Sequence, residues 1–403
     1  MSMGLPPPVP AVRRALGQRA GALALLLLPL LAACSAPRGA GPDATIYAAS
    51  KTGAVSALDA ANGAVLWQNH CYCVLGMAVD SNHHTLLVTT FDSAVAALDT
   101  TTGKFDWRST IGTDGMLDKL YLVGSMVIAA SHPFPDTHAG RSVIVALDAR
   151  SGALLWRVSL PGAITGALDI HTDRIYASVN PANASGSVGP GAIYALRATD
   201  GAQVWRAMAP TTLVAGPVSD QTQVYAPTNV GSVFALRASD GALQWNQNIS
   251  ASGPLSALFA NATAIYVGDG DATMRALSKA DGSVLWTRTI PNTTTVLGPL
   301  VYTPSDGGSL VLLSSDSTPI VDALSPSAGS VVWSQEAPGP GLPLFVLGDY
   351  IYLSVSDGIA ILTLAQGRYA ADYPVYNASS GYTSAEQVDL GDIAYIVAGP
   401  PRG

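Results

Sequence analysis

A short phrase recurs seven times along the chain, and each copy ends in tryptophan. The first three copies read VSALDAANGAVLW, VAALDTTTGKFDW and VIVALDARSGALLW, with a glycine four residues before the tryptophan. The tryptophans are Trp67, Trp107, Trp156, Trp205, Trp245, Trp286 and Trp333, and the glycines are Gly63, Gly103, Gly152, Gly201, Gly241, Gly282 and Gly329. An eighth copy, IAILTLAQGRYAA, keeps a glycine but has Ala371 in the tryptophan position. Since this position holds every tryptophan of the protein, the chain is built from internal repeats.

The length of the repeat predicts the architecture. Successive tryptophans are 40, 49, 49, 40, 41 and 47 residues apart, which is typical of a four-stranded blade in a β-propeller. A short apolar segment such as TIYAAS precedes each phrase, the phrase itself reads as a hairpin, and a further apolar piece such as GPVSDQ follows. Only 12% of the residues are charged, and 40 Gly and 27 Pro favour short strands and tight turns. We therefore expect an all-β chain, an eight-bladed propeller of four-stranded antiparallel blades over residues 44–403.

The two ends of the repeat region complement one another. The first repeat lacks strand material ahead of TIYAAS, whereas the tail SAEQVDLGDIAYIVAG extends beyond the eighth repeat. Because an open ring would leave exposed sheet edges, we expect residues 384–398 to return and complete the first blade, so that the C-terminal segment closes the propeller.

The glycine and the tryptophan have different physical roles in the phrase. A hairpin loop of this length normally ends with a residue at positive φ, which glycine adopts at least cost. A large flat ring on the outer strand can cover the junction between neighbouring blades, so each tryptophan is expected to pack between blades. The alternative is an aromatic surface that stacks sugars or bases.

On these residues the chain resembles the PQQ-like β-propeller superfamily. Its tryptophan-docking repeat reads Ala, any residue, Asp, three residues, Gly, three residues, Trp, and Ala57, Asp59, Gly63 and Trp67 match it in full. Later copies replace the Asp by Arg197, Arg237, Ser278 or Ser325. The resemblance covers roughly residues 44–398. It implies a fold shared by quinoprotein dehydrogenases and by non-catalytic factors, including the propeller lipoprotein of the outer-membrane β-barrel assembly machinery.

The N-terminus resembles a bacterial lipoprotein signal peptide. Arginines near the start are followed by the apolar run AGALALLLLPLL and then by LAAC, which ends at Cys34. Residues 1–33 are expected to be the signal peptide, and residues 34–43 a lipidated flexible tether. Acyl chains on Cys34 would hold the protein on the cell membrane or outer membrane, outside the cytoplasm. An ordinary secretory signal and a twin-arginine export signal are the alternatives.

A few polar clusters could form a catalytic or metal-binding site. Quinone-binding members of the superfamily use adjacent cysteines, a calcium site, a general-base aspartate and an arginine, but here Cys71 and Cys73 are separated by one residue. The segments expected to form inner strands are poor in charge, with Asp118, Lys119 and Asp169 the main candidates. No cofactor is therefore expected. Two short clusters leave a metal-dependent sensor open as an alternative. They are His70, Cys71 and Cys73, and His132, Asp136 and His138.

Two repeats are longer than the others at the same joint. The repeats ending at Trp156 and Trp205 carry their extra residues between the IY-type strand and the hairpin, in 132–141 and 180–191. Because the repeats are consecutive, these loops should lie side by side on one face. The candidate interaction residues are His132, Asp136, His138, Arg141, Asn180 and Asn183. The alternative is that both loops are neutral insertions.

Charge narrows the class of partner. The net charge of −8 and the absence of a basic run beyond the N-terminus argue against nucleic acid or an anionic membrane face as the partner. We expect a monomeric, lipid-anchored binding or scaffolding module with an unknown protein partner, not an enzyme. A role in envelope or outer-membrane protein assembly is one option, and a quinoprotein dehydrogenase or a ligand-binding or metal-dependent sensor propeller is the alternative.

Overall fold

Every regular element of the described residues is a β-strand, from two residues in β12 to nine in β8. The computed structural model describes residues 44–50, 53–60, 63–71, 73–80, 82–113, 115–133, 140–181, 189–250, 255–269, 272–290, 296–302, 308–315, 320–336, 344–347, 349–355, 358–374 and 393–401. Within these ranges there is no helix of the length and apolarity that would cross a bilayer. The expectation of an all-β chain is confirmed.

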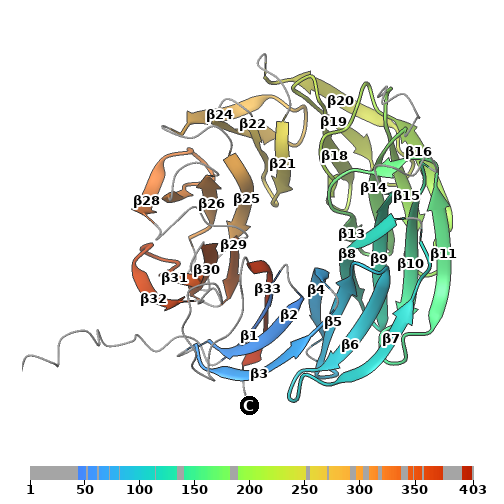
Figure 1. Ribbon diagram of the computed structural model, residues 1–403. Coiled ribbons are helices and arrows are strands. Elements are labelled where there is room, and N and C mark those ends of the chain that lie inside the picture. The colour runs from blue at the N-terminus through green and yellow to red at the C-terminus, as the bar shows by residue number, and fades with distance from the viewer. Residues whose placement is uncertain are drawn as a thin grey trace, which may run out of the picture. The chain divides into compact units, whose positions relative to one another are not determined.

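The strands form eight antiparallel sheets, numbered here as blades 1 to 8 along the chain (Figure 1). Blade 1 contains β33 (Ile393–Pro401), β1 (Ala44–Ser50), β2 (Ala54–Asp59) and β3 (Val65–His70). Blade 2 contains β4 (Val74–Asp80), β5 (Thr85–Thr90), β6 (Ala94–Asp99) and β7 (Phe105–Thr110). Blade 3 contains β8 (Gly115–Val123), β9 (Met126–Pro133), β10 (Ser142–Asp148) and β11 (Leu154–Leu160). Blade 4 contains β12 (Ala163–Ile164), β13 (Asp169–His171), β14 (Arg174–Asn180), β15 (Ala192–Arg197) and β16 (Gln203–Met208).

The remaining blades repeat the same order. Blade 5 contains β17 (Val218–Ser219), β18 (Gln223–Pro227), β19 (Ser232–Arg237) and β20 (Leu243–Asn248). Blade 6 contains β21 (Leu255–Ala260), β22 (Ala264–Asp269), β23 (Thr273–Ser278) and β24 (Val284–Thr289). Blade 7 contains β25 (Val296–Tyr302), β26 (Leu310–Ser315), β27 (Ile320–Leu324) and β28 (Val331–Glu336). Blade 8 contains β29 (Leu344–Leu347), β30 (Tyr350–Val355), β31 (Gly358–Thr363) and β32 (Tyr369–Pro374).

The hydrophobic core lies between the blades. The second strand of a blade is buried along nearly its whole length, as in β5, because both faces of the sheet are covered. Each apolar cluster combines two successive blades: one joins Val55 of blade 1 to Leu86 of blade 2, and another joins Ile144 of blade 3 to Ile175 of blade 4. The sequence accordingly shows continuous apolar runs there, not alternation.

A β-bulge interrupts the outer hairpin of every blade. In blade 3, Ala146 pairs with Trp156 but Leu147 pairs with Leu154, so Leu155 is an extra residue on the outer strand. The equivalent register shift occurs in the other seven blades. A bulge twists an edge strand and hinders pairing with a foreign strand. In blade 3 both residues before the tryptophan, Leu154 and Leu155, are exposed.

The C-terminal strand completes the first sheet. β33 pairs with β1 in antiparallel register, with Ala48 opposite Ile396. This pairing was expected of residues 384–398, whereas the strand spans Ile393–Pro401; residues 384–392 lie outside the described residues. Within the unit Arg38–Gly403, β33 contacts β4 of the next blade, and inner strands of neighbouring blades contact one another similarly, as β4 does β8 (Figure 1).

Candidate functional site

Each of the seven tryptophans on an outer strand reaches the next blade. The indole Nε1 of Trp67 donates a hydrogen bond to the carbonyl oxygen of Thr100 at 2.7 Å, across the seam between blades 1 and 2. The other six tryptophans donate at 2.8 to 3.1 Å to Ala149, Ala198, Ala238, Lys279, Pro326 and Leu364. Each acceptor carbonyl lies in the outer hairpin turn of the following blade.

The glycine of that turn lies directly against the indole of the preceding blade. Gly103 has φ +68°, and a Cβ added there would lie 2.4 Å from Cε3 of Trp67. Glycine is therefore needed twice, for a left-handed backbone and for the close approach of the ring. The sequence pattern indicates only the first reason. The same contact is made by Gly152, Gly201, Gly241, Gly282, Gly329 and Gly367.

A tyrosine of the second strand supports the indole in several blades. Tyr176 and Trp205 have ring centroids 5.8 Å apart in a tilted arrangement, and both side chains reach the carbonyl oxygen of Ala238 in blade 5. Tyr266 and Trp286 form the same pair against blade 7. Tilted aromatic pairs at this separation are favourable beyond their buried area.

The outer turns are capped in two ways. In blade 2 the carboxylate of Asp99 accepts hydrogen bonds from the backbone N–H groups of Thr101 and Thr102, at 3.1 and 2.7 Å. In blade 4, where Arg197 replaces this aspartate, the carboxylate comes from Asp200, which pairs with the arginine at 2.6 Å. The loss of the repeat's aspartate is thus offset within the same turn.

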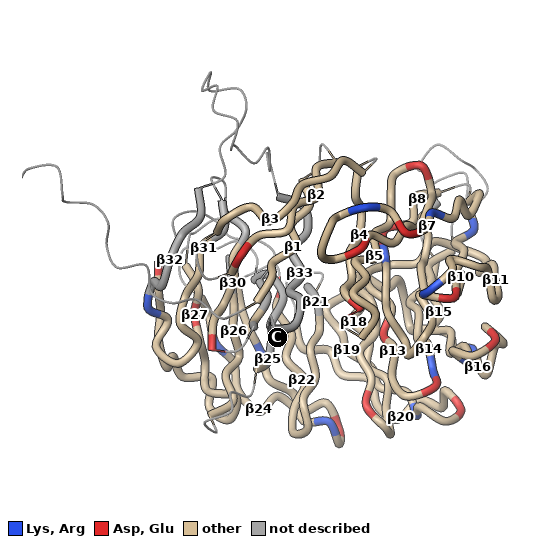
Figure 2. Tube along the Cα trace, turned by 90° about the horizontal axis from the view of Figure 1, so that it is seen from below, with Lys and Arg blue, Asp and Glu red and all other residues tan. Residues whose placement is uncertain are grey.

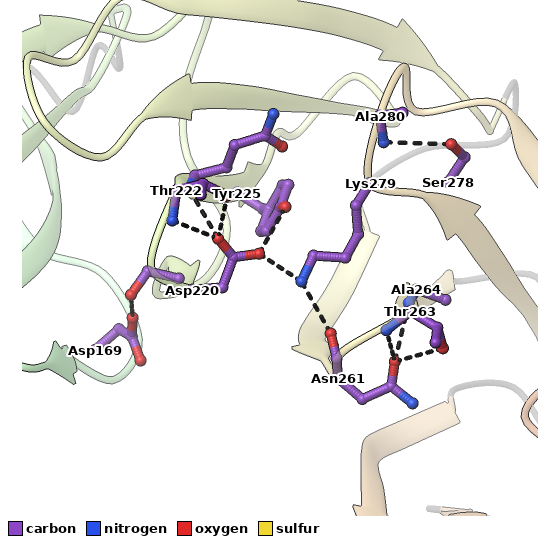
Figure 3. A network of polar contacts seen from close by, with 12 residues as sticks. Asp169, Asp220, Thr222, Tyr225, Asn261, Thr263, Ala264, Ser278, Lys279 and Ala280 are labelled. Atoms are coloured by element: carbon purple, nitrogen blue, oxygen red, sulfur yellow. Dashed lines mark hydrogen bonds and ion pairs between the residues drawn. The ribbon is translucent and has the colours of Figure 1, made fainter.

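The seam between blades 5 and 6 carries an additional polar contact (Figure 3). The ammonium group of Lys279, in the outer turn of blade 6, forms an ion pair with Asp220 of blade 5 and donates to the carbonyl oxygen of Asn261 at 2.9 Å. Tyr225 donates its hydroxyl hydrogen to Asp220 at 3.1 Å, and Trp245 donates to the Lys279 carbonyl. One lysine therefore joins the two blades through both its backbone and its side chain.

The charge state of Asp220 follows from these contacts. Burial disfavours its ionised form, but the hydrogen bond from Lys279 and those from the backbone and hydroxyl groups of the adjoining turn outweigh burial. The pKa of Asp220 therefore lies well below its usual range. Burial and the neighbouring carboxylate raise the pKa of Tyr225, which stays a neutral donor.

Two further carboxylates lie on inner strands, each held by a neighbour. Ser219 of β17 donates to Asp169 of β13, and burial raises the pKa of Asp169 (Figure 3). On β8, Asp118 contacts the Lys119 ammonium at 3.0 Å and Nδ1 of His132 at 2.7 Å. Burial of Asp118 is outweighed by the hydrogen bond from His132 and by the lysine, which lower its pKa.

The expected interaction loops leave the same end of neighbouring blades. The first connects β9 to β10 in blade 3, and the second connects β14 to β15 in blade 4. His132 contacts Asp118 within its own blade, and Arg141 is exposed. Asp136, His138 and Asn183 lie outside the described residues.

Asn180 has a structural contact of its own. Its side-chain amide donates to the carbonyl oxygen of Leu213 at 2.8 Å and accepts from the Leu213 N–H at 3.0 Å. Leu213 lies in the segment that leads from blade 4 to blade 5, so the amide fastens this segment to the end of β14. Asn180 is thus held at the base of the second loop, with its polar atoms already occupied.

The cysteines and the acidic residues on inner strands are the side chains that could bind a metal ion or a quinone. Cys71 and Cys73 are both free thiols, and burial raises the pKa of Cys71 to about 11. Among the described residues, no three His, Cys, Asp or Glu side chains are grouped so that they could hold a metal ion. A calcium-bound quinone needs several oxygen ligands together, whereas Asp118 and Asp169 are each held by their own neighbours. The described side chains do not fit that group.

Comparisons with known proteins agree with this architecture. A family model described as outer membrane protein assembly factor BamB matches residues 12–131 and 189–368, more than half of the chain. BamB of Bordetella pertussis strain Tohama I is 29% identical over 118 residues, which are 29% of this chain and 28% of that protein. The chain therefore matches well under two thirds of this relative's length.

Solved structures share the fold. BamB from Moraxella catarrhalis has a TM-score of 0.57 and 19% identity, over 78% of this chain and 89% of that one. Quinohemoprotein alcohol dehydrogenase from Comamonas testosteroni has a TM-score of 0.59 and 13% identity, over 82% and 72%. The predicted propeller class and the resemblance to PQQ-like propellers are confirmed. By its match to the family model, the chain belongs to the outer membrane protein assembly factor BamB family.

Proposed function

We propose that this propeller is a lipid-anchored scaffold outside the cytoplasm, which binds protein partners during the assembly of outer-membrane proteins. Family membership supports the assembly role, and the LAAC sequence ending at Cys34 supports the lipid anchor. The observation that supports the proposal is that β9 and β14, the strands that lead into the two long loops, end on the same side of blades 3 and 4.

The physical basis is a rigid platform with variable loops. Seven indole contacts and the apolar seams fix successive blades, so the strand ends that bear the loops keep a defined separation. The inner-strand carboxylates of Asp118 and Asp169 are each held by a neighbouring side chain. This arrangement favours recognition of another protein by surface loops over turnover of a small molecule.

Capture of partners from detergent-solubilised envelopes tests the binding role. The full chain would be compared with a variant in which residues 134–139 and 182–188 are each replaced by two glycines. The matched control is the pair Arg237→Gln and Asp240→Asn, in an outer turn at the opposite end of a blade. We expect components of the β-barrel assembly machinery to be retained by the full chain and the control, and lost from the loop variant. Equal capture by all three proteins would contradict the proposal.

The anchor and the absence of catalysis need separate measurements. Mass spectrometry of the mature N-terminus should find acyl chains on Cys34 and none after Cys34→Ser.

Protein incubated with pyrroloquinoline quinone and calcium should show no retained quinone absorbance and no dye reduction with alcohols or sugars. A stoichiometric quinone band with turnover would favour the dehydrogenase alternative, and an unmodified Cys34 would contradict the anchor.

A further inference from the structure

The outer strands of blades 3 and 4 carry exposed basic and apolar side chains to which the scaffold role assigns no function. In both strands an arginine directly follows the docking tryptophan, giving Arg157 in β11 and Arg206 in β16. Both are exposed, as is Arg141, which lies just before β10 at the end of the first long loop. Neither β11 nor β16 contains an acidic residue.

These three arginines lack a carboxylate partner among the described residues. Arg157 donates to the backbone carbonyl oxygens of Ile111 and Gly112 in blade 2, at 3.0 and 3.2 Å. The guanidinium of Arg206 lies 5.4 Å from the centre of the Tyr194 ring. Both contacts hold the side chain in place but leave its charge unneutralised. By contrast, Arg108 at the equivalent position of blade 2 forms an ion pair with Asp92.

Large apolar side chains are exposed on the same two strands. Leu154 and Leu155 of β11 are 55% and 50% exposed, and Met208 at the end of β16 is 56% exposed. The bulge in the outer hairpin directs both leucines outward. Exposed apolar side chains beside arginines are the composition that favours the boundary between headgroups and acyl chains of a bilayer.

We propose that this surface, made of Arg141, Arg157, Arg206, Leu154, Leu155 and Met208 and called the arginine rim, contacts the anionic phospholipid headgroups of a bilayer. The net charge of the whole chain is −8, but β11 and β16 themselves carry no acidic residue. Asp148 and Asp200 lie in the outer turns that precede these strands, where they cap the backbone. Figure 2 shows lysine and arginine positions interspersed with acidic positions on the side that carries β7, β10, β11 and β15.

The sequence before blade 1 makes such a contact geometrically accessible. The tether of residues 34–43 can span at most about 35 Å when fully extended. A lipid on Cys34 would therefore keep the blades close to the bilayer. The arginine rim would then set which side of the propeller faces the lipid, while the long loops stay available to a protein partner. The rim itself does not depend on the partner-binding role.

Vesicle binding by the full mature chain carrying Cys34→Ser tests the rim without the anchor. Flotation would compare vesicles of equal parts phosphatidylglycerol and phosphatidylcholine with vesicles of phosphatidylcholine alone. We expect binding to the anionic vesicles only, and a loss of that binding as salt is raised. Each arginine near an anionic surface contributes about 1 kcal/mol, or about fivefold. The triple variant R141Q/R157Q/R206Q should therefore bind roughly a hundredfold more weakly.

A matched variant separates the rim from net charge. The substitutions R150Q/R197Q/R237Q remove three exposed arginines from outer turns and change the net charge equally; they should alter binding by less than about twofold. The variant R141K/R157K/R206K keeps the charge, so it should retain most of the binding. Far-ultraviolet circular dichroism would establish that each variant is folded.

Three results would overturn the inference: no binding of the parent chain to anionic vesicles, equal binding by the rim variant, or an equal loss in the outer-turn variant. These outcomes are independent of the partner-capture experiment. Because Arg141 is also a candidate interaction residue of the first long loop, the double variant R157Q/R206Q is used for this comparison. If it still captures assembly components but binds vesicles more weakly, the two proposals are supported separately. Vesicle binding by a full chain that captures no assembly components would contradict only the scaffold role.

Discussion

At the scale of single residues, the fold depends on the contact between a tryptophan and a glycine one blade further along. The ring covers the glycine while its N–H satisfies a carbonyl of the same turn, so one side chain provides both packing and a hydrogen bond. The two roles explain why the pair recurs together. They also predict that a methyl group at the glycine is costly beyond its backbone strain.

The substitution Gly241→Ala measures this cost. The residue has φ +74°, and an added Cβ would lie 2.7 Å from Cε3 of Trp205. We expect a loss of about 2 to 4 kcal/mol in the free energy of unfolding, measured by denaturant titration. The control is Gly112→Ala, because Gly112 has φ +61° and nothing within 4 Å of its Cβ position. Its cost should be about 1 kcal/mol; equal losses at the two sites would contradict the role of the ring.

The ion pair between Lys279 and Asp220 is testable by a double-mutant cycle. Both side chains are about one-fifth to one-quarter exposed, so their attraction is only partly screened. Lys279→Gln and Asp220→Asn should show a coupling energy of about 1 kcal/mol. The exposed pair of Arg237 and Asp240 serves as the control, with an expected coupling near zero. A larger coupling energy for Arg237 and Asp240 than for Lys279 and Asp220 would show that the ion pair between the blades does not add to stability.

At the scale of elements, the outer hairpin turns depend on ionised carboxylates. Hydrogen bonds from Thr102 lower the pKa of Asp99, and those from Ser151 lower the pKa of Asp148. The same direction holds for Asp200, Asp240 and Asp281. In these turns the folded state binds protons less readily than the unfolded chain, whose aspartates titrate near a pKa of about 3.9.

Stability should therefore fall with acid. The ionised aspartates of these turns contribute fully to the free energy of unfolding when the pH is above their pKa in the unfolded chain. This contribution is lost as the pH falls through their lower pKa values in the folded protein. We expect the denaturation midpoint to be flat from about pH 5 to 7 and to decline below about pH 4. Asp99→Asn should reduce the slope of that decline. A midpoint that rises toward acid pH would contradict this reading.

The sequence predicts the elements better than their polar contacts. The tryptophan period, the turn glycine and the apolar runs identify the hairpins and seams, because these depend on local pattern and on residue type. In blade 4, Arg197 takes the place of the repeat's aspartate and Asp200 supplies the carboxylate instead. The sequence pattern does not reveal this replacement, because Asp200 occupies a different position in the turn. The contact of Asp118 with His132 and that of Lys279 with Asp220 join residues far apart in the chain, so no local spacing indicates them.

At the scale of the whole molecule, the two chain ends meet in one sheet. Seven seams carry an indole contact, but in blade 8 the position opposite Ile361 is Ala371, where the other blades have tryptophan. The following blade is also the one whose inner strand, β33, comes from the C-terminus. We therefore expect closure at this point to depend more on strand pairing than any seam that has an indole does.

Removal of residues 384–403 should expose the edge of β1. We expect this truncated chain to aggregate or to unfold at lower denaturant than the full chain, because an unpaired apolar edge invites foreign strands. A second variant, Ile396→Pro, removes one backbone donor opposite Ala48 and should lower stability by a smaller amount. Size-exclusion chromatography and thermal unfolding would measure both. A truncated chain that stays monomeric and as stable as the parent would contradict the closure.

The central claim is that each tryptophan side chain fastens one blade to the next. It is tested most directly by nuclear magnetic resonance of protein carrying ¹⁵N-labelled tryptophan, with hydrogen exchange followed for each indole N–H. Since all seven Nε1 atoms donate to carbonyl oxygens of the following blade, we predict seven resolved indole signals that exchange far more slowly than free indole. Indole signals that exchange at the free rate would contradict the claim.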